Sequence, residues 1–285
     1  MILIDYNQAM ITSLTGKWAR SIESTEENLR AIFLERIRTI QRKYSGEFGK
    51  TVICCDGPNY WRKRMFPFYK AGRKAIRDNS SMDWPMIHTM LTKFRSELIE
   101  HFPYKVIHLE GAEADDIIGV LAKAISPHEP VLILSGDGDF KQLQKFPNVK
   151  QYSPITQKFL VSENPDMELK EKIMRGDRGD GIPNFLSPDN TFLTEDTKQT
   201  TLTTKKVSLW LQQNPEVFCD TAEATRGWDR NKTLIDLDCI PDEIINRIMT
   251  EYENQDDRPV FRRDGLISYF IANGMIRFME NLQDF

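Results

Sequence analysis

Residues 131–139 are Val131-Leu132-Ile133-Leu134-Ser135-Gly136-Asp137-Gly138-Asp139, and this stretch decides the fold of the chain. Four apolar residues in succession predict a strand that is buried on both faces, as in a parallel sheet. Two aspartates separated by a glycine follow the strand. In sheets of this kind ligands bind beyond the carboxyl ends of the strands, so these aspartates are predicted to lie at a ligand site.

Three further apolar runs predict strands at Met1–Ile4, Thr51–Cys55 and Lys105–Leu109. The segments between them have helical character and predict helices over Glu26–Tyr44, Asp83–Phe102 and Glu113–Ala124. Strands and helices in alternation are typical of βαβ units with a mostly parallel central sheet flanked by helices. The predicted fold class is therefore α/β.

The character of the chain changes after about residue 160. A short helix is predicted at Met167–Arg175, a long flexible loop at Phe185–Thr204, and helices at Lys205–Gln213, Asp242–Tyr252 and Leu266–Leu282. Two domains are expected. Residues 1–180 would form the α/β core, and residues 181–285 a smaller, mostly helical domain that binds DNA or a partner protein.

Composition bounds the class of protein. The 285 residues are 40% apolar and 28% charged, which is ordinary for a soluble globular chain. No apolar run approaches the roughly 20 residues that cross a bilayer. Four cysteines without a Cys-x-x-Cys pair argue against a zinc site or a disulfide framework. We expect a cytoplasmic monomer with reduced thiols.

Acidic residues recur where a strand ends or a helix begins. They are Asp5, Asp56, Glu113, Asp115, Asp116, Asp137, Asp139, Asp177 and Asp180. Carboxylates gathered at one edge of a sheet cannot all stay ionised without positive charge between them. Mg²⁺ and Mn²⁺ prefer oxygen ligands and suit such a group, and they indicate phosphate chemistry.

Each of these acids also has a plain structural interpretation. Asp137 and Asp139 fit a turn that caps a following helix. Acids in the first turn of a helix, as at Glu113–Asp116, stabilise it through the helix dipole by about 0.3–1 kcal/mol each. Asp5 and Asp56 could simply begin loops, and Gly176–Gly181 could be a helix exit. Metal binding is favoured because the acids would share one edge of the sheet.

A basic segment at residues 58–82 interrupts the α/β pattern. The net charge of the chain is −4, yet Trp61–Arg77 contains seven bases and no acid. Bases neutralise phosphates, and interleaved aromatic rings stack on unpaired bases. We interpret the segment as an arch that binds nucleic acid, against the alternative of a solvated basic loop. The predicted nucleic-acid-binding residues are Arg62, Lys63, Arg64, Tyr69, Lys74 and Arg77.

These parts together predict phosphodiester hydrolysis with two metal ions. The first ion would draw on Asp5, Asp56, Glu113 and Asp115, and the second on Asp137, Asp139 and Asp177 or Asp180; Asp116 is a further candidate ligand. Lys70 and Arg73 are predicted to be catalytic, because they would stabilise charge on the scissile phosphate.

The ordered set of motifs resembles the 5′-exonuclease and flap endonuclease family. The matching segments are Leu3-Ile4-Asp5, Cys55-Asp56, Glu113–Asp116, Ser135–Phe140, Gly176–Asp180, Tyr60-Trp61-Arg62 and Tyr69–Arg73. Lys150–Pro154 and Leu234–Asp242 resemble the phage ribonuclease H branch of that family. One departure is that Asn184–Thr204 contains no glycine, where the wider family has a Gly-x-Gly hairpin that holds duplex phosphate through a monovalent ion.

The resemblance implies a PIN-like core and a Mg²⁺-dependent 5′→3′ nuclease, with Mn²⁺ as a substitute ion. Such an enzyme removes RNA primers from lagging-strand fragments and cuts 5′ flaps, acting on RNA–DNA hybrids and duplex DNA. It also implies replication partners: a single-stranded-DNA-binding protein and, with less support, a sliding clamp. Two other hypotheses stay open, namely a PIN-like ribonuclease that cleaves free RNA and a non-catalytic junction-binding protein.

Overall fold

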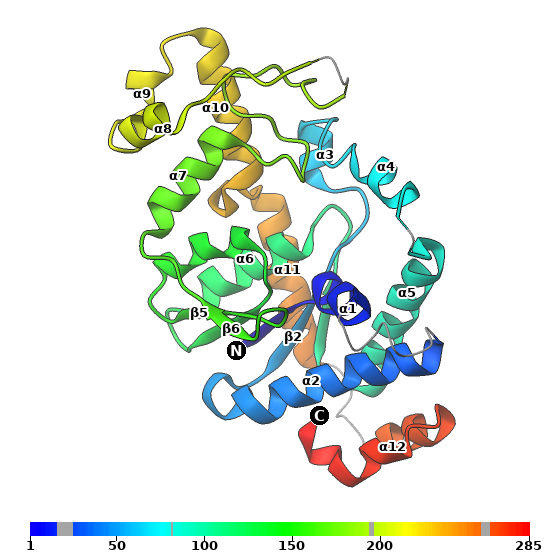
Figure 1. Ribbon diagram of the computed structural model, residues 1–285. Helices are drawn as coiled ribbons and strands as arrows, with labels where there is room; N and C mark the ends of the chain where they lie inside the picture. The colour runs from blue at the N-terminus through cyan, green and yellow to red at the C-terminus, as the bar shows by residue number, and fades with distance from the viewer. Residues whose placement is uncertain (16–24, 81, 194–196, 258–262) are drawn as a thin grey trace.

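The fold is built around one six-stranded sheet (Figure 1), seen in a computed structural model that describes residues 1–15, 25–80, 82–193, 197–257 and 263–285. The strand order is β3-β2-β1-β4-β5-β6. The strands are β1 (Ile2–Asp5), β2 (Thr51–Cys55), β3 (Lys105–His108), β4 (Val131–Leu134), β5 (Val149–Ser153) and β6 (Lys158–Leu160). The first five run parallel, and β6 is antiparallel to β5. The carboxyl ends of β1, β2 and β4 therefore meet at one edge.

Helices cover both faces of the sheet, which is why the central strands β1, β2 and β4 are mainly apolar. One face packs in a cluster with α1 (Tyr6–Thr15), α2 (Glu26–Phe48), α5 (Trp84–His101) and α12 (Arg263–Ala272). The other packs with α6 (Ala114–Ile125), η2 (Gly138–Lys145) and α11 (Asp242–Asn254). Adjacent strand residues point to opposite faces, and accordingly Cys54 and Cys55 lie in different clusters. All four cysteines are free thiols.

A third cluster joins the arch to the helical half of the chain. The arch contains α3 (Trp61–Met65) and α4 (Arg73–Asp78), and the helical half begins with α7 (Pro165–Arg175), α8 (Thr204–Leu211), α9 (Pro215–Phe218) and α10 (Ala222–Ile235). Phe66 and Tyr69 of the arch are buried together with Ile173, Phe185 and Trp228. The base of the arch is thus fixed by the same core that fixes α7 and α10.

The predicted α/β class with a mostly parallel sheet is confirmed, and all four predicted strands are present. Strands β5 and β6 and helices α1 and α10 were not predicted. Helix α10 has a polar sequence with Gly227 in its interior, and packing explains it. A Cβ atom at Gly227 would lie 1.9 Å from the carbonyl oxygen of Phe185, so only glycine allows this approach. Asn231 is fully buried and donates to the carbonyl oxygens of Ile173 and Pro183.

The predicted continuous helix over Leu266–Leu282 is wrong. Helix α12 ends at Ala272, Gly274 takes a φ of 69°, and a separate 3₁₀ segment, η5 (Ile276–Asp284), follows. The left-handed backbone at Gly274 reverses the chain, and the amide of Met275 bonds back to the carbonyl of Phe270 at 2.8 Å. The predicted domain boundary at residue 180 stays a prediction. Helix α12, from the predicted second domain, packs into the cluster of α2 and α5.

Two short 3₁₀ turns, η3 (Leu237–Cys239) and η4 (Gln255–Asp257), flank α11. The predicted loop at Phe185–Thr204 has no helix or strand in its described part, up to its last residue, where α8 begins. None of the described helices is long and apolar enough to span a bilayer.

Candidate active site

The ends of β1 and β4 lie together at the predicted edge of the sheet. Asp5, the last residue of β1, is 7% exposed and accepts hydrogen bonds from the amide of Gln8 and the hydroxyl of Ser135, both at 3.1 Å. Ser135 follows β4, and its hydroxyl also accepts from the amide of Asp137 at 3.1 Å. Ser135 therefore links the acid of one strand to the acidic turn of its neighbour.

Asp56 follows β2 and joins the same edge to α6. One carboxylate oxygen accepts from the amide of Ala114 at 2.9 Å, the first residue of that helix. The other accepts from the side-chain amide of Asn7 at 2.5 Å. Asp56 is thus oriented by two neighbouring elements.

Asp137 caps η2, which agrees with the capping turn that the sequence offered as an alternative to metal binding. Its side chain accepts from the amide of Asp139 at 3.0 Å. The cap uses one oxygen of Asp137, so capping and metal binding do not exclude each other at this residue.

The start of α6 is a buried ion-pair network. Glu113 and Asp116 form a capping box, and both carboxylates bond to the guanidinium of Arg62, at 3.0 and 2.7 Å. Asp116 also accepts from the indole of Trp61 at 3.1 Å and is 0% exposed. Three protein donors bond to its two oxygens and the residue is not exposed, so the prediction of Asp116 as a metal ligand is corrected: this acid stabilises the fold.

Two predicted nucleic-acid contacts need the same correction. Arg62 is 3% exposed, and its guanidinium also donates to the carbonyl of Leu234. Tyr69 is 2% exposed, and its hydroxyl lies 3.0 Å from both Glu113 and Asp180. Both side chains are inside the protein and bonded there, so neither is placed to contact nucleic acid. Lys63, Arg64 and Lys74 are exposed and Arg77 is half-buried; these four stay predictions.

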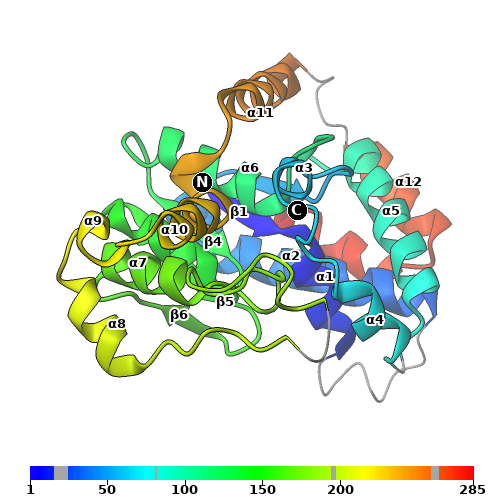
Figure 2. The ribbon, with the colours of Figure 1, turned by 90° about the horizontal axis from the view of Figure 1, so that it is seen from above.

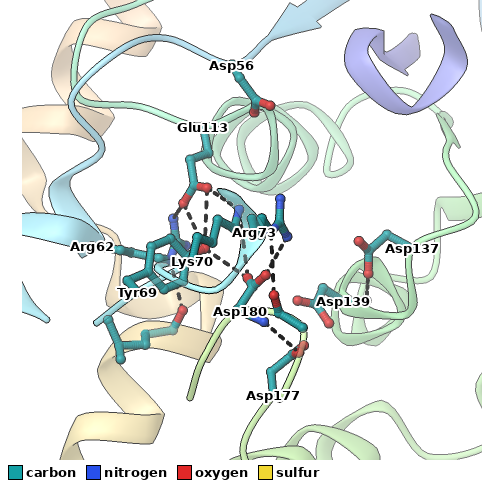
Figure 3. Close-up of polar contacts among 12 residues, drawn as sticks. Asp56, Arg62, Tyr69, Lys70, Arg73, Glu113, Asp137, Asp139, Asp177 and Asp180 are labelled. Atoms are coloured by element: carbon teal, nitrogen blue, oxygen red, sulfur yellow. Dashed lines mark hydrogen bonds and ion pairs between the residues drawn. The ribbon is translucent and has the colours of Figure 1, made fainter. Parts of the chain in front are cut away.

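The predicted catalytic bases reach the acids from the arch (Figure 3). Lys70 forms an ion pair with Glu113 and lies 3.8 Å from Asp180, and Arg73 pairs with Asp180 at 2.5 Å. The backbone of Lys70 has a φ of 56°, and its amide donates to the carbonyl of Asp180 at 2.8 Å. A non-glycine residue in this region is costly and marks a constrained position.

Asp177 and Asp180 project from a tight loop after α7. The loop closes because the backbones of Asp177 and Ile182 exchange two hydrogen bonds of 2.8 Å. Gly181 takes a φ of 74°, and a Cβ atom there would lie 2.8 Å from the carbonyl oxygen of Phe68 in the arch. Glycine is therefore required where the loop and the arch touch.

Lys172 connects the last two acidic motifs. Its ammonium pairs with Asp139 and lies 2.9 Å from Asp177. Asp115, Asp139, Asp177 and Asp180 all line one small cavity of about 10 Å³, which is the space of a single water molecule. Four of the acids that lie far apart in the sequence thus line one cavity, and the ammonium of Lys172 pairs with two of them.

The electrostatics separate the acids into two kinds. Burial and then the charge of Asp56 raise the pKa of Asp5 to about 7. Burial also raises the pKa of Asp115 well above its usual range, which Lys70 only partly offsets. Burial alone would raise the pKa of Glu113, but Lys70 and Arg62 hold it below its usual value. Asp5 and Asp115 therefore lack the positive charge that Glu113 has.

Comparison with known proteins identifies this arrangement. Residues 2–173 match the family model described as 5′-3′ exonuclease, N-terminal resolvase-like domain. The chain belongs to the 5′-3′ exonuclease family. Residues 163–285 match the model described as T4 RNase H, C terminal. The protein is thus a 5′-3′ nuclease, and metal dependence is typical of its family.

Ribonuclease H of Enterobacteria phage T4 is 29% identical to this nuclease over 293 residues, covering 99% of this chain and 95% of that protein. Flap endonuclease Xni of Shewanella piezotolerans is 35% identical over 133 residues, covering 43% of this chain and 48% of that protein. The D15 protein of T5, co-crystallised with metal ions, has the same fold, with a TM-score of 0.67 at 15% identity over 89% of this chain and 98% of that one.

The residues of the nuclease fit a divalent cation by the chemistry of the donor set. In the described part of the chain, no three acidic, histidine or cysteine side chains are close enough as they stand to hold an ion. Lys172, Lys70 and Arg73 pair with the acids instead. Carboxylate oxygens are the ligands that hard cations prefer, and the raised pKa values of Asp5 and Asp115 show where positive charge is lacking.

The residues that support the acids were not predicted. Asn7 and Gln8 orient Asp56, Asp5 and, through the amide of Gly136, the turn after β4. They stand two and three residues after Asp5, and a polar pair so close to a strand-ending acid could have marked them. Lys172 had no such signal, because it is one of several bases on an amphipathic helix.

Proposed function

We propose that this protein is a Mg²⁺-dependent, structure-specific 5′→3′ nuclease acting on RNA–DNA hybrids, duplex DNA and 5′ flaps. Its role would be to remove RNA primers from lagging-strand fragments during phage DNA replication, in the cytoplasm of the host cell. The observation that carries the proposal is the convergence of acids from β1, β2, α6, β4 and the loop after α7 beneath a basic arch. The similarity to phage T4 ribonuclease H along nearly the whole chain supports the substrate class.

The acids would hold two Mg²⁺ ions, with Mn²⁺ able to substitute. We assign Asp5, Asp56, Glu113 and Asp115 to one ion, and Asp137, Asp139 and Asp177 or Asp180 to the other. When bound, such ions activate the attacking water and stabilise the leaving oxygen of an in-line displacement at phosphorus. The protein contributes orientation: Ser135, Asn7 and the amide of Ala114 fix the carboxylates of Asp5 and Asp56.

Lys70 and Arg73 would stabilise charge on the scissile phosphate. Both already lie among the acids, Lys70 against Glu113 and Arg73 against Asp180. Burial lowers the pKa of Lys70, but the negative charges of Glu113 and then Asp180 raise it further, so the net pKa lies above its usual value. The ammonium therefore stays charged at neutral pH. A permanent cation held at the edge of the acidic cavity is suited to an anionic substrate.

Substrate contact outside the cavity would come from exposed bases of the arch, Lys63, Arg64 and Lys74. An enzyme with this role in replication would work with a single-stranded-DNA-binding protein and, with weaker support, a sliding clamp. We propose these partners from the replication role and not from a surface of the protein.

The test is digestion of a 5′-labelled RNA primer annealed to a DNA template, with and without Mg²⁺. We expect release of short 5′ products only with Mg²⁺. Asp137→Asn should abolish that cleavage and leave hybrid binding intact, because it removes a charge from the metal site and keeps the shape of the cap. Unchanged cleavage in Asp137→Asn would reject the site.

The same assay separates the two alternative functions. A PIN-like ribonuclease would cleave free RNA faster than the hybrid or a 5′ flap. A non-catalytic junction-binding protein would bind the hybrid without cleaving it under any metal condition.

A further inference from the structure

Two arginines from distant parts of the chain meet over one glycine on the outer side of the arch base. The position that a Cβ atom would take at Gly111 lies 3.7 Å from Nη2 of Arg64 and 3.8 Å from Nη1 of Arg247. Those two distances limit the separation of the nitrogens to at most about 7.5 Å. Arg64 belongs to α3 in the arch and Arg247 to α11 in the helical half.

Neither guanidinium is neutralised. Within the described residues, Arg64 and Arg247 have no hydrogen bond or ion pair, and both side chains are exposed. Glu110, the acid next to Gly111, is bonded to the side chain of Asn59 at 3.0 Å. Two like charges held close together without a counter-ion repel each other, so an anion bound between them would stabilise the arrangement.

The backbone of Gly111 is held in place by two hydrogen bonds. Gly111 has a φ of 88°, its amide donates to the carbonyl of Pro58 at 2.7 Å, and its carbonyl accepts from the amide of Trp61 at 2.9 Å. The loop before α6 is therefore tied to the base of the arch. The position of a Cβ atom at Gly111 would also lie 3.4 Å from Cδ1 of Ile244, so the two guanidinium groups stand beside a glycine and an apolar side chain.

The site is separate from the metal-binding acids but close to them. Arg62, on the same short helix as Arg64, is turned inward to Glu113, and Gly111 and Glu113 are two residues apart, at most about 7 Å between Cα atoms. In Figure 2, α11 lies on the opposite side of the sheet from α1 and α2. The two arginines therefore lie beside the base of the arch, near the acid Glu113 and on the α11 side of the sheet.

We propose that Arg64 and Arg247 form a clamp for a backbone phosphate of the single-stranded 5′ arm of the substrate. The inference rests on the proposed function, since it assigns a second contact to the same substrate. Guanidinium groups bind phosphate oxygens with charge-assisted hydrogen bonds of about 2.7–2.9 Å, and two such bonds to one phosphate fit a gap of this size. Arg247 lies 131 residues or more from every catalytic and metal-site candidate of the arch and of α6, and its proximity to Arg64 exists only in the folded chain.

The experiment measures binding by fluorescence anisotropy in EDTA, where cleavage does not interfere. The probes are a DNA duplex with a single-stranded 5′ arm and the same duplex without the arm. Arg64→Ala with Arg247→Ala should weaken binding of the armed duplex about tenfold, the loss of one or two charge-assisted contacts. The slope of log affinity against log salt should fall by about 0.7 for each lost contact. Arg247→Lys should recover part of the affinity, and Arg277→Ala, an exposed arginine elsewhere on the chain, should change nothing.

An equal loss on both probes would overturn the assignment to the 5′ arm and place the contact on the duplex. Unchanged binding of both probes would overturn the clamp altogether; if a poly-glutamate peptide then loses binding in the double variant, the site takes an acidic protein segment. Failure of the proposed function is distinguishable from these outcomes, because the unaltered protein would then also fail to cleave the hybrid with Mg²⁺.

Discussion

Two groups of acids in this molecule differ in what neutralises them. Glu113 and Asp116 are buried against Arg62, with Lys70 and Trp61 adding further bonds. Asp5 is buried and Asp115 half-buried, and neither forms an ion pair within the described residues. Burial raises the pKa of both acids, and it also raises that of Asp116, which Arg62 offsets only in part. Glu113 and Asp115 are separated by a single residue, so the difference arises from which way each side chain faces.

The presence of a guanidinium partner distinguishes an acid that stabilises the core from one that is suited to bind a metal ion. A buried carboxylate with its own guanidinium partner is part of the core, and removing that partner leaves an uncompensated charge. A buried carboxylate without one destabilises the metal-free protein and gains from a bound cation. We therefore expect Asp116 to matter most for stability, and Asp5 and Asp115 for metal binding and cleavage. Glu113, which pairs with both Arg62 and Lys70, belongs to the buried network and to the proposed metal site.

The largest effect is expected for Arg62→Ala. This change leaves Glu113 and Asp116 buried with less positive charge, which costs about 3–5 kcal/mol of unfolding free energy. Urea denaturation in EDTA measures it. The matched control is Lys145→Ala, which breaks a partly exposed pair with Asp238 at 2.5 Å and should cost no more than about 1 kcal/mol. Equal losses of unfolding free energy in the two variants would show that the buried network at α6 stabilises the fold no more than an exposed ion pair does.

The next effect concerns Lys70, which pairs with an acid of the first group but points toward the cavity. Lys70→Ala should lower the turnover number by about 10²-fold, the loss typical of one donor to transition-state charge. Affinity for the hybrid should change far less. Lys74→Ala, an exposed base on the same arch, should instead weaken binding and spare turnover. Steady-state kinetics measure the turnover number, and fluorescence anisotropy measures the affinity for the hybrid. Equal losses of turnover and affinity in Lys70→Ala would show that Lys70 contributes only to substrate binding.

A smaller effect of opposite sign is expected for Asp115→Asn. The raised pKa of Asp115 means that its ionisation destabilises the folded state at pH values above the unfolded pKa of about 3.9. Removing the charge should therefore stabilise the metal-free protein at pH 7.5, by on the order of 1 kcal/mol. The gain should disappear as the pH falls toward 4, because wild-type Asp115 is then neutral as well. Thermal unfolding in EDTA across this pH range would refute the idea if the variant were less stable throughout.

The smallest effect is expected for Lys172→Ala. The ammonium of Lys172 lies between Asp139 and Asp177, where it competes with a divalent cation. Its removal should raise Mn²⁺ affinity by up to about fivefold, the scale of a partly exposed ion pair. Isothermal titration calorimetry checks it, with Lys141→Ala, which pairs with Glu168 at 3.0 Å outside the cavity, as control. Weaker Mn²⁺ binding in Lys172→Ala would mean that the lysine supports the metal site.

Prediction from sequence succeeded where the signal is local. The run Val131–Leu134 is apolar because both faces of β4 are buried, and that alone indicates a parallel sheet. Prediction failed where packing between distant segments decides. Helix α10 is polar along its sequence and exists because Gly227 and Asn231 fit against Phe185, Ile173 and Pro183. The continuous helix at the end of the chain failed because Gly274 takes a left-handed backbone.

The sequence by itself determined the α/β class, the edge of the sheet at which the acids gather, and the charge of the arch, since each depends on residues next to one another in the chain. Only the tertiary structure decided the role of each charged side chain. Arg62 and Arg64 stand two residues apart in one basic run, yet one is bonded inside to Glu113 and the carbonyl of Leu234 and the other is exposed beside Gly111. The physical reason is that the free energy of a charge depends on what surrounds it in three dimensions, and those neighbours come from parts of the chain that sequence spacing does not connect.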